Sequence, residues 1–133
     1  MNIKSFVKAV WELPQNVIGF IVKQVCRASF YTTYKDANIY SWNINGGMSL
    51  GKYVFVPFKQ VAPTTSKIQQ FLKHEYGHTI QSKYLGWLYL PVIALPSLLW
   101  AQCFKWYWTK PGKSYYVFYT ESSADRLGGV ERR

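Results

Sequence analysis

Acidic residues are scarce in this chain. The 133 residues include 6 Asp and Glu against 16 Lys and Arg, so the formal net charge is +10. A charge of this sign favours anionic partners such as a nucleic acid or the anionic face of a membrane. Because the sequence has no glycine-rich loop, helix-turn-helix pattern or aromatic RNA-recognition motif, a nucleic acid is unlikely as a partner. Peripheral contact with an anionic membrane is the remaining expectation.

Cysteine and histidine are also rare, with two residues of each type. Cys26 and Cys103 lie far apart and neither belongs to a CxxC pair, which excludes a disulfide framework and favours buried thiols. The N-terminal apolar stretch is interrupted by Glu12 and Pro14 and lacks a small-residue cleavage site, so we expect no signal peptide. We therefore expect a cytoplasmic protein. Any peripheral membrane contact would then be with the inner face of the membrane.

Hydrophobic residues make up 49% of the chain and aromatic residues 19%, and they are spread over its whole length. This composition is not that of a disordered chain, and 133 residues are enough to bury a core without disulfide bonds. We expect a single domain over residues 1–133.

The first half of the chain combines a helical and a strand pattern. Residues 1–26 form an apolar segment that suits one or two amphipathic helices with a break at Leu13-Pro14. Residues 27–57 mix β-branched and aromatic residues with turn signals at Asn45-Gly46-Gly47 and Gly51. This second pattern predicts a small antiparallel sheet.

The second half returns to helical patterns, and the whole chain therefore predicts an α+β fold. Ser66 and Gln69 have the spacing of a capping box and predict a helix over residues 67–84. The uncharged run 84–104 predicts a proline-broken apolar helical hairpin. A last helix is predicted from Tyr115 to the glycine pair 128–129.

The segment Lys73 to His78 reads KHEYGH and contains an HExxH sequence inside a predicted helix. His74 and His78 are one helical turn apart, so both imidazoles project from the same face and can bind one zinc ion. Glu75 lies beside them, where it can act as a general base on a metal-activated water. The sequence therefore predicts a zinc site with one Zn²⁺ ion on this helix.

A zinc site with an open position needs a third protein ligand, and no further histidine is present. Glu121 and Asp125 are four residues apart and share one face of the last predicted helix. Glu121 is the candidate third ligand. Asp125 is the candidate acceptor for the outer N–H of a ligand histidine, with His74 favoured, because such a contact fixes the tautomer of the imidazole.

HExxH followed on a later helix by ExxxD resembles the gluzincin metallopeptidases, the thermolysin-like group, and the small size resembles the one-domain minigluzincins. The segments KHEYGHTIQSKYLG and FYTESSAD also resemble small uncharacterised bacterial proteins. The resemblance covers only these two short segments. It implies that His74, His78 and Glu121 bind zinc, that Glu75 is the base and that Asp125 supports a histidine.

The gluzincin resemblance also implies a His or Tyr, outside the two motifs, that stabilises the oxyanion. Since no histidine is spare, a tyrosine must serve. The candidates are Tyr115, Tyr116 and Tyr119, which are closest in sequence to Glu121, and Tyr53 from the sheet.

Minigluzincin-like enzymes further imply an edge strand that binds the substrate backbone by strand addition. Residues 51–56 or their hairpin partner 44–50 are available for this role, and the sequence does not choose between them.

The uncharged run 84–104 is just long enough to span a membrane. A full crossing would separate His78 from Glu121 by about 30 Å of hydrocarbon, which is incompatible with the zinc site. Pro91 and Pro96 favour instead a bent segment that packs in the core, forms an oligomer interface or dips into one leaflet. The sequence leaves these three alternatives open.

Together these features predict a zinc metalloendopeptidase that hydrolyses a peptide or protein substrate. The alternative is a catalytically inactive zinc-containing binding or structural module, with or without association with a membrane. Both readings need the same three ligands, and only the first needs Glu75.

Overall fold

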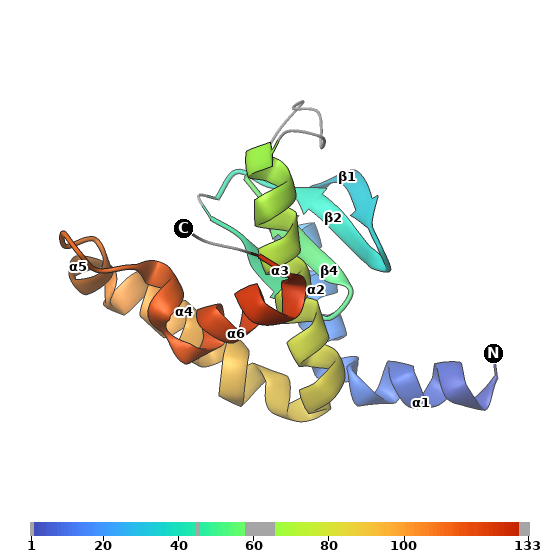
Figure 1. Ribbon diagram of the computed structural model, residues 1–133. Helices are drawn as coiled ribbons and strands as arrows, with labels where there is room; N and C mark the ends of the chain where they lie inside the picture. Colours follow the sequence, from blue (N-terminus) through green and yellow to red (C-terminus); the bar gives the residue numbers. More distant parts are fainter. Residues whose placement is uncertain (1, 45, 58–65, 131–133) are drawn as a thin grey trace.

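The computed structural model describes residues 2–44, 46–57 and 66–130. It combines helices with one four-stranded sheet (Figure 1), which confirms the predicted α+β class. The strands are β1 (Ser29–Tyr34), β2 (Ala37–Ser41), β3 (Met48–Leu50) and β4 (Tyr53–Val56). The helical elements in the described residues are α1 (Ile3–Trp11), α2 (Leu13–Val25), α3 (Ser66–Leu85), η1 (Gly86–Leu88), η2 (Leu90–Ala94), α4 (Leu95–Cys103), α5 (Lys105–Trp108), η3 (Tyr115–Val117) and α6 (Tyr119–Gly128).

Helices cover both faces of the sheet, because its central strand is apolar on both sides. Val54, Phe55 and Val56 of β4 are fully buried. The face toward α3 contains the cluster Ala37, Ile39, Val54, Val56, Ile68 and Leu72. The face toward α2 contains Trp42, Leu50 and Phe55, with Val22 packed against them. In Figure 1, α3 lies in front of the sheet and α2 behind it.

The sheet is mixed, so the prediction of a purely antiparallel sheet is wrong. The strand order is β1-β2-β4-β3, with β2 parallel to β4 and the other two pairs antiparallel. The physical reason is the apolar run of β4, which is buried on both faces and so takes a central place, leaving the shorter β3 at the edge. A glycine with φ of 64° at position 51 makes the tight turn between β3 and β4.

The N-terminal apolar segment forms two helices with a break at Glu12, next to the predicted Leu13-Pro14 break. The α3 helix already includes Ser66, so Ser66 is not its cap as the capping box predicted, and the preceding residue lies outside the described range. Buried thiols are not found, because Cys26 is only partly buried and Cys103 is exposed.

The uncharged run is a continuous helical arm, so the prediction of a hairpin within residues 84–104 is wrong. We call residues 86–104 the apolar arm. Pro91 and Pro96 lie in the first turns of η2 and α4, where a missing N–H is tolerated, and the helical backbone continues past both. Among the described residues, no helix has both the length and the hydropathy needed to cross a membrane.

Candidate metal centre

The part of α3 from His74 to Ser82 buries polar side chains where a core helix would bury apolar ones. His74, Glu75 and His78 have exposed fractions of 4%, 5% and 5%. Burying such groups is unfavourable unless each finds a hydrogen-bonding or charged partner. The α6 helix, which packs directly on α3, provides partners for the two histidines, and Ser49 of β3 provides one for Glu75.

Two glycines allow α3 and α6 to approach backbone to backbone. A Cβ at Gly77 would overlap the carbonyl oxygen of Ala124, and a Cβ at Gly128 would overlap that of Lys73. Neither carbonyl can rotate away, because both belong to helix backbone. This close approach carries Glu121 and Asp125 of α6 onto the histidine face of α3.

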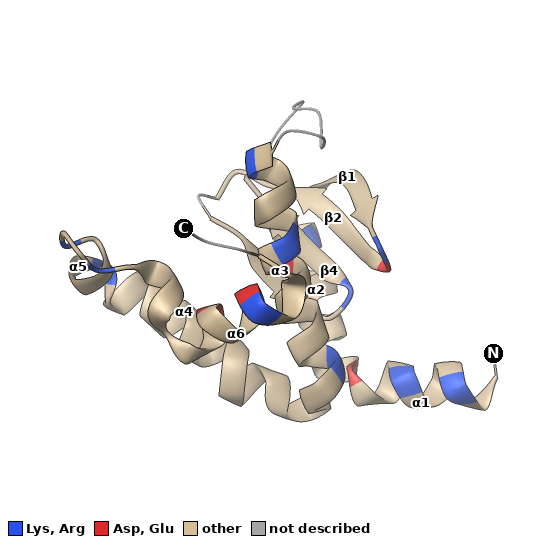
Figure 2. Ribbon diagram, viewed as in Figure 1, with Lys and Arg blue, Asp and Glu red and all other residues tan. Residues whose placement is uncertain are grey.

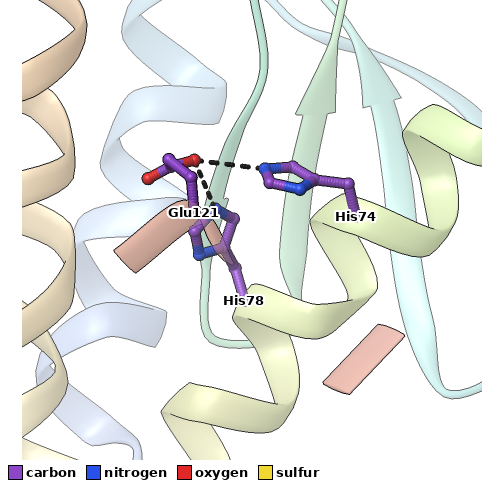
Figure 3. A group of neighbouring side chains, drawn as sticks. All are labelled: His74, His78 and Glu121. Atoms are coloured by element: carbon purple, nitrogen blue, oxygen red, sulfur yellow. Dashed lines mark hydrogen bonds and ion pairs between the residues drawn. The ribbon is translucent and has the colours of Figure 1, made fainter. Parts of the chain in front are cut away.

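His74, His78 and Glu121 meet at one point. Figure 3 shows the two imidazoles projecting from successive turns of α3 toward the Glu121 carboxylate. The Nε2 atoms of both histidines lie 3.1 Å from Oε1 of Glu121. The three candidate ligand atoms lie within 4.8 Å of one another, and all three residues are buried. Tetrahedral zinc with bonds of about 2.0–2.1 Å places its ligand atoms about 3.3 Å apart, close to the separations found here.

The outer nitrogen of each histidine faces an acceptor. His74 Nδ1 lies 2.6 Å from Oδ1 of Asp125, the contact that the sequence spacing favoured. His78 Nδ1 lies 2.7 Å from Oε1 of Gln81. The amide orientation of Gln81 is fixed, because its Nε2 donates to the carbonyl oxygen of Thr120 at 3.0 Å. Both Nδ1 atoms therefore carry the proton, and both Nε2 atoms present a lone pair to the shared centre.

Two lone pairs and a carboxylate oxygen pointing at one position repel one another unless a cation lies between them. That cation is either a proton on an imidazole or a metal ion. A set of two imidazoles and one carboxylate, with the imidazoles oriented from outside, is the donor set of a divalent metal site. The residues present therefore fit a bound metal ion.

Without a metal, a proton takes its place. Burial acts to lower the pKa of His78, but the hydrogen bond to Glu121 and the charges of Glu121 and Glu75 outweigh it and raise this pKa to about 9. Burial acts in the opposite sense on Glu121, yet the hydrogen bonds with His74 and His78 hold the pKa of its carboxyl far below the ordinary value. Glu121 is therefore a carboxylate, the form that binds metal.

The second oxygen of Glu121 is held by two hydroxyl groups. Ser97 donates to Oε2 at 2.6 Å and Thr120 donates to it at 2.7 Å. Ser97 belongs to α4, so the apolar arm contributes a hydrogen bond to the centre. The sequence does not predict this contact, because nothing in the segment around Ser97 relates it to Glu121.

Glu75 is anchored beside the centre. Ser49 of the edge strand β3 lies with its hydroxyl 2.8 Å from Oε2 of Glu75. A Cβ at Gly47 would lie 2.6 Å from Oε1, so only a glycine fits against this oxygen. The charge of Glu75 helps to raise the pKa values of His78 and Tyr115, which places its carboxylate near both groups.

The tyrosines predicted to stabilise an oxyanion lie in different places. Burial, and then the charges of Glu121 and Glu75, raise the pKa of the Tyr115 phenol, so Tyr115 lies near both carboxylates. The ring of Tyr116 packs edge-on against His74 with centroids 5.2 Å apart. Tyr119 is half exposed and donates its hydroxyl to the carbonyl oxygen of Val92 at 2.7 Å. Tyr53 packs in the cluster on the α2 side of the sheet, away from α3.

The remaining acidic residues lie outside the centre. Glu12 accepts a hydrogen bond from Ser82 at 2.6 Å, and Asp36 pairs with Lys83. Glu131 lies outside the described residues. Of the contacts that the sequence did not predict, two had a local signal: Gln81 follows His78 by three residues on the same helix, and Thr120 directly precedes Glu121.

The chain was compared with protein-family models, curated proteins and solved structures, and none of them matches it significantly. No family is therefore assigned to the chain.

Proposed function

We propose that the protein is a zinc-dependent peptidase in which His74, His78 and Glu121 hold the metal and Glu75 is the general base. The observation that carries the proposal is the meeting of two imidazole Nε2 atoms and one carboxylate oxygen, beside a second buried carboxyl group. The gluzincin-like order of HExxH and ExxxD supports it, as does the contact between His74 and Asp125.

A bound zinc ion would supply a Lewis acid for the scissile carbonyl and lower the pKa of a water. Glu75 accepts the proton of the attacking water and returns it to the leaving amine. Ser49 occupies Oε2 of Glu75, so Oε1 is the atom that takes this proton. Tyr115 remains protonated because its pKa is raised, and its phenol is the candidate donor to the oxyanion.

The edge strand β3 is the candidate site for the substrate backbone. It flanks α3 and leaves one side unpaired in the described sheet. The carbonyl oxygen of Ser49 already accepts a hydrogen bond from Tyr89 at 2.7 Å, so a peptide that adds to this strand must replace that bond or pair beyond it. Of the two segments that the sequence offered for strand addition, residues 44–50 are therefore favoured, because β3 is an edge strand. The strand within residues 51–56 is β4, which is central and already paired on both sides.

A second candidate function is a zinc-containing structural or binding module without turnover. The observation in its favour is burial, since Glu121 is 1% exposed and neither histidine exceeds 5%. Closed zinc sites stabilise a fold, whereas catalytic sites need access for water and substrate.

Metal content and peptide hydrolysis test the two candidates together. We expect about one zinc per wild-type chain and a sharp loss of zinc in His78→Ala and Glu121→Ala. Glu75→Gln should retain zinc and lose hydrolysis of a mixed quenched-fluorescent peptide library. Glu12→Gln is the matched control, because Glu12 is a carboxylate with the same 5% exposed fraction outside the centre.

The outcomes separate the candidates. Zinc bound without hydrolysis in the wild type would favour the structural module. A wild type that binds no zinc, or zinc retained in Glu121→Ala, would contradict both.

A further inference from the structure

Exposed apolar side chains are concentrated in one part of the molecule. Most of the large ones lie on α1, on α2 or within residues 86–108. The exceptions in the described chain are Phe30, Ile44, Tyr84, Val117 and Tyr119. Scattered exposed apolar residues are ordinary, but a concentrated set marks an interaction surface.

The short α1 helix has nothing within the described chain to cover its apolar side. None of its nine residues is buried. Ile3, Phe6 and Val7 have exposed fractions of 79%, 58% and 59%, and their spacing places them on one face. A helix of this length is marginal in water unless its apolar face packs against something.

The apolar arm is apolar on both sides. Its inner side carries Tyr89, Ile93 and Trp100, which are buried. Its outer side carries residues such as Leu88, with an exposed fraction of 59%, and Leu95, with 53%. A helix that is apolar all round normally lies in a core or in contact with lipid.

The three exposed helices are joined. Trp87 of η1 donates its Nε1 hydrogen to the carbonyl oxygen of Val10 at 2.6 Å, which fixes the arm to α1. Gln15 of α2 donates to the carbonyl oxygen of Gly86 at 2.9 Å. In Figure 1, α1 and the arm extend to opposite sides of this junction.

The charges around these helices have one sign. Figure 2 shows lysines on α1 and around α5 at the tip of the arm. In the sequence, Lys4 and Lys8 belong to the first group, and Lys105, Lys110 and Lys113 to the second. The one acidic residue of segments 2–28 and 84–118 is Glu12, which is buried against Ser82.

We infer that α1, the outer face of α2 and the outer side of the apolar arm dock on the surface of an anionic lipid bilayer. Apolar side chains flanked by lysines and tryptophans are the composition of an interfacial, membrane-lying segment. A second copy of the chain is a poorer occupant, because each copy has a formal charge of +10 and presents the same basic residues.

Vesicle sedimentation tests this docking with the full chain. The protein should bind vesicles of phosphatidylcholine mixed with phosphatidylglycerol more tightly than vesicles of phosphatidylcholine alone. High salt should weaken the binding, since the basic residues act through screened charges. Replacing Lys4 or Lys8 by Ser should weaken it by about fivefold each.

Three apolar variants test which surface makes the contact. Phe6→Ser and Leu95→Ser should each reduce binding by about tenfold. Phe30→Ser is the matched control, because Phe30 of β1 is 59% exposed against 58% for Phe6, and it should bind as the wild type does. Circular dichroism and zinc content of each variant show whether the fold is retained.

The inference is overturned if the protein ignores anionic vesicles, or if Phe30→Ser weakens binding as much as Phe6→Ser does. It is also overturned if Phe6→Ser converts a dimer into a monomer without vesicles, since a second copy would then cover the surface. Zinc removal should leave vesicle binding unchanged. A failure of this inference is therefore distinguishable from a failure of the proposed peptidase.

Discussion

Replacing Gly77 with alanine tests whether the metal centre depends on the backbone contact between α3 and α6. The new Cβ would overlap the carbonyl oxygen of Ala124, which cannot rotate away. Because real Cβ atoms essentially never approach within 3.0 Å, α6 has to withdraw by about 1 Å. Glu121 lies on the same helix one turn before Ala124, so it moves with it.

The expected loss is larger for zinc binding than for stability. A shift of about 1 Å exceeds the tolerance of about 0.2 Å for a metal–ligand distance, so we expect zinc affinity to fall by at least about 100-fold. Alanine gains up to about 1 kcal/mol of helix propensity, whereas overpacking costs about 1–3 kcal/mol. The free energy of unfolding of the metal-free protein should therefore fall by only about 0–2 kcal/mol.

Competition with a chromophoric chelator measures the zinc affinity, and urea unfolding measures the stability. Gly128→Ala should reproduce the effect, because its Cβ would overlap the carbonyl oxygen of Lys73 at the other end of the contact. Lys73→Ala, at an exposed position of α3, is the control and should bind zinc normally. Wild-type zinc affinity in Gly77→Ala would refute the argument that this close contact positions Glu121.

Further predictions concern the contacts around the centre. Gln81→Leu should weaken zinc binding by about 10–100-fold in the same competition assay, because His78 loses the acceptor for its Nδ1 hydrogen; unchanged affinity would contradict the tautomer assignment. Tyr115→Phe should lower kcat for peptide hydrolysis by about 100-fold with zinc content unchanged; loss of zinc instead would make Tyr115 a structural group. Partial burial acts to raise the pKa of Asp36, but hydrogen bonds from Lys83 and Tyr76 hold it below 3.8, so its contribution to stability is present above pH 3.8 and lost as pH falls through the lowered pKa. Asp36→Asn should therefore cost at most about 1 kcal/mol at neutral pH, and less in acid, by urea unfolding; an equal loss at both pH values would exclude the ion pair as its cause.

The parts of the centre that the sequence predicted are those that depend on local geometry. The four-residue spacing of His74 and His78 places both on one helix face whatever surrounds the helix. The same holds for Glu121 and Asp125 on α6. That the two pairs meet is a matter of tertiary packing, and the sequence suggested it only through the need for a third ligand without a further histidine and through the gluzincin resemblance. The small residues Gly77, Ala124 and Gly128, which permit the contact, were a signal that the sequence analysis did not use.

The errors in the predicted fold arise from non-local choices. Strand order depends on which strand gains most from burial on both faces, and β4 takes the central place for that reason. The hairpin prediction assumed that Pro91 and Pro96 would break the helix. Both instead lie where the helical type changes, Pro91 at the start of the π-helical turn η2 and Pro96 at the start of α4, and the helical backbone continues past them as one arm.

The two hydroxyl groups on Glu121 also decide how many of its oxygens a metal can use. Ser97 and Thr120 occupy Oε2, while both histidines face Oε1. Glu121 is thus prepared for monodentate coordination, and the protein offers three donor atoms rather than four. A four-coordinate ion bound there would keep one coordination position open, and both the Ser97 and the Thr120 hydroxyl would have to be removed before the second oxygen could fill it.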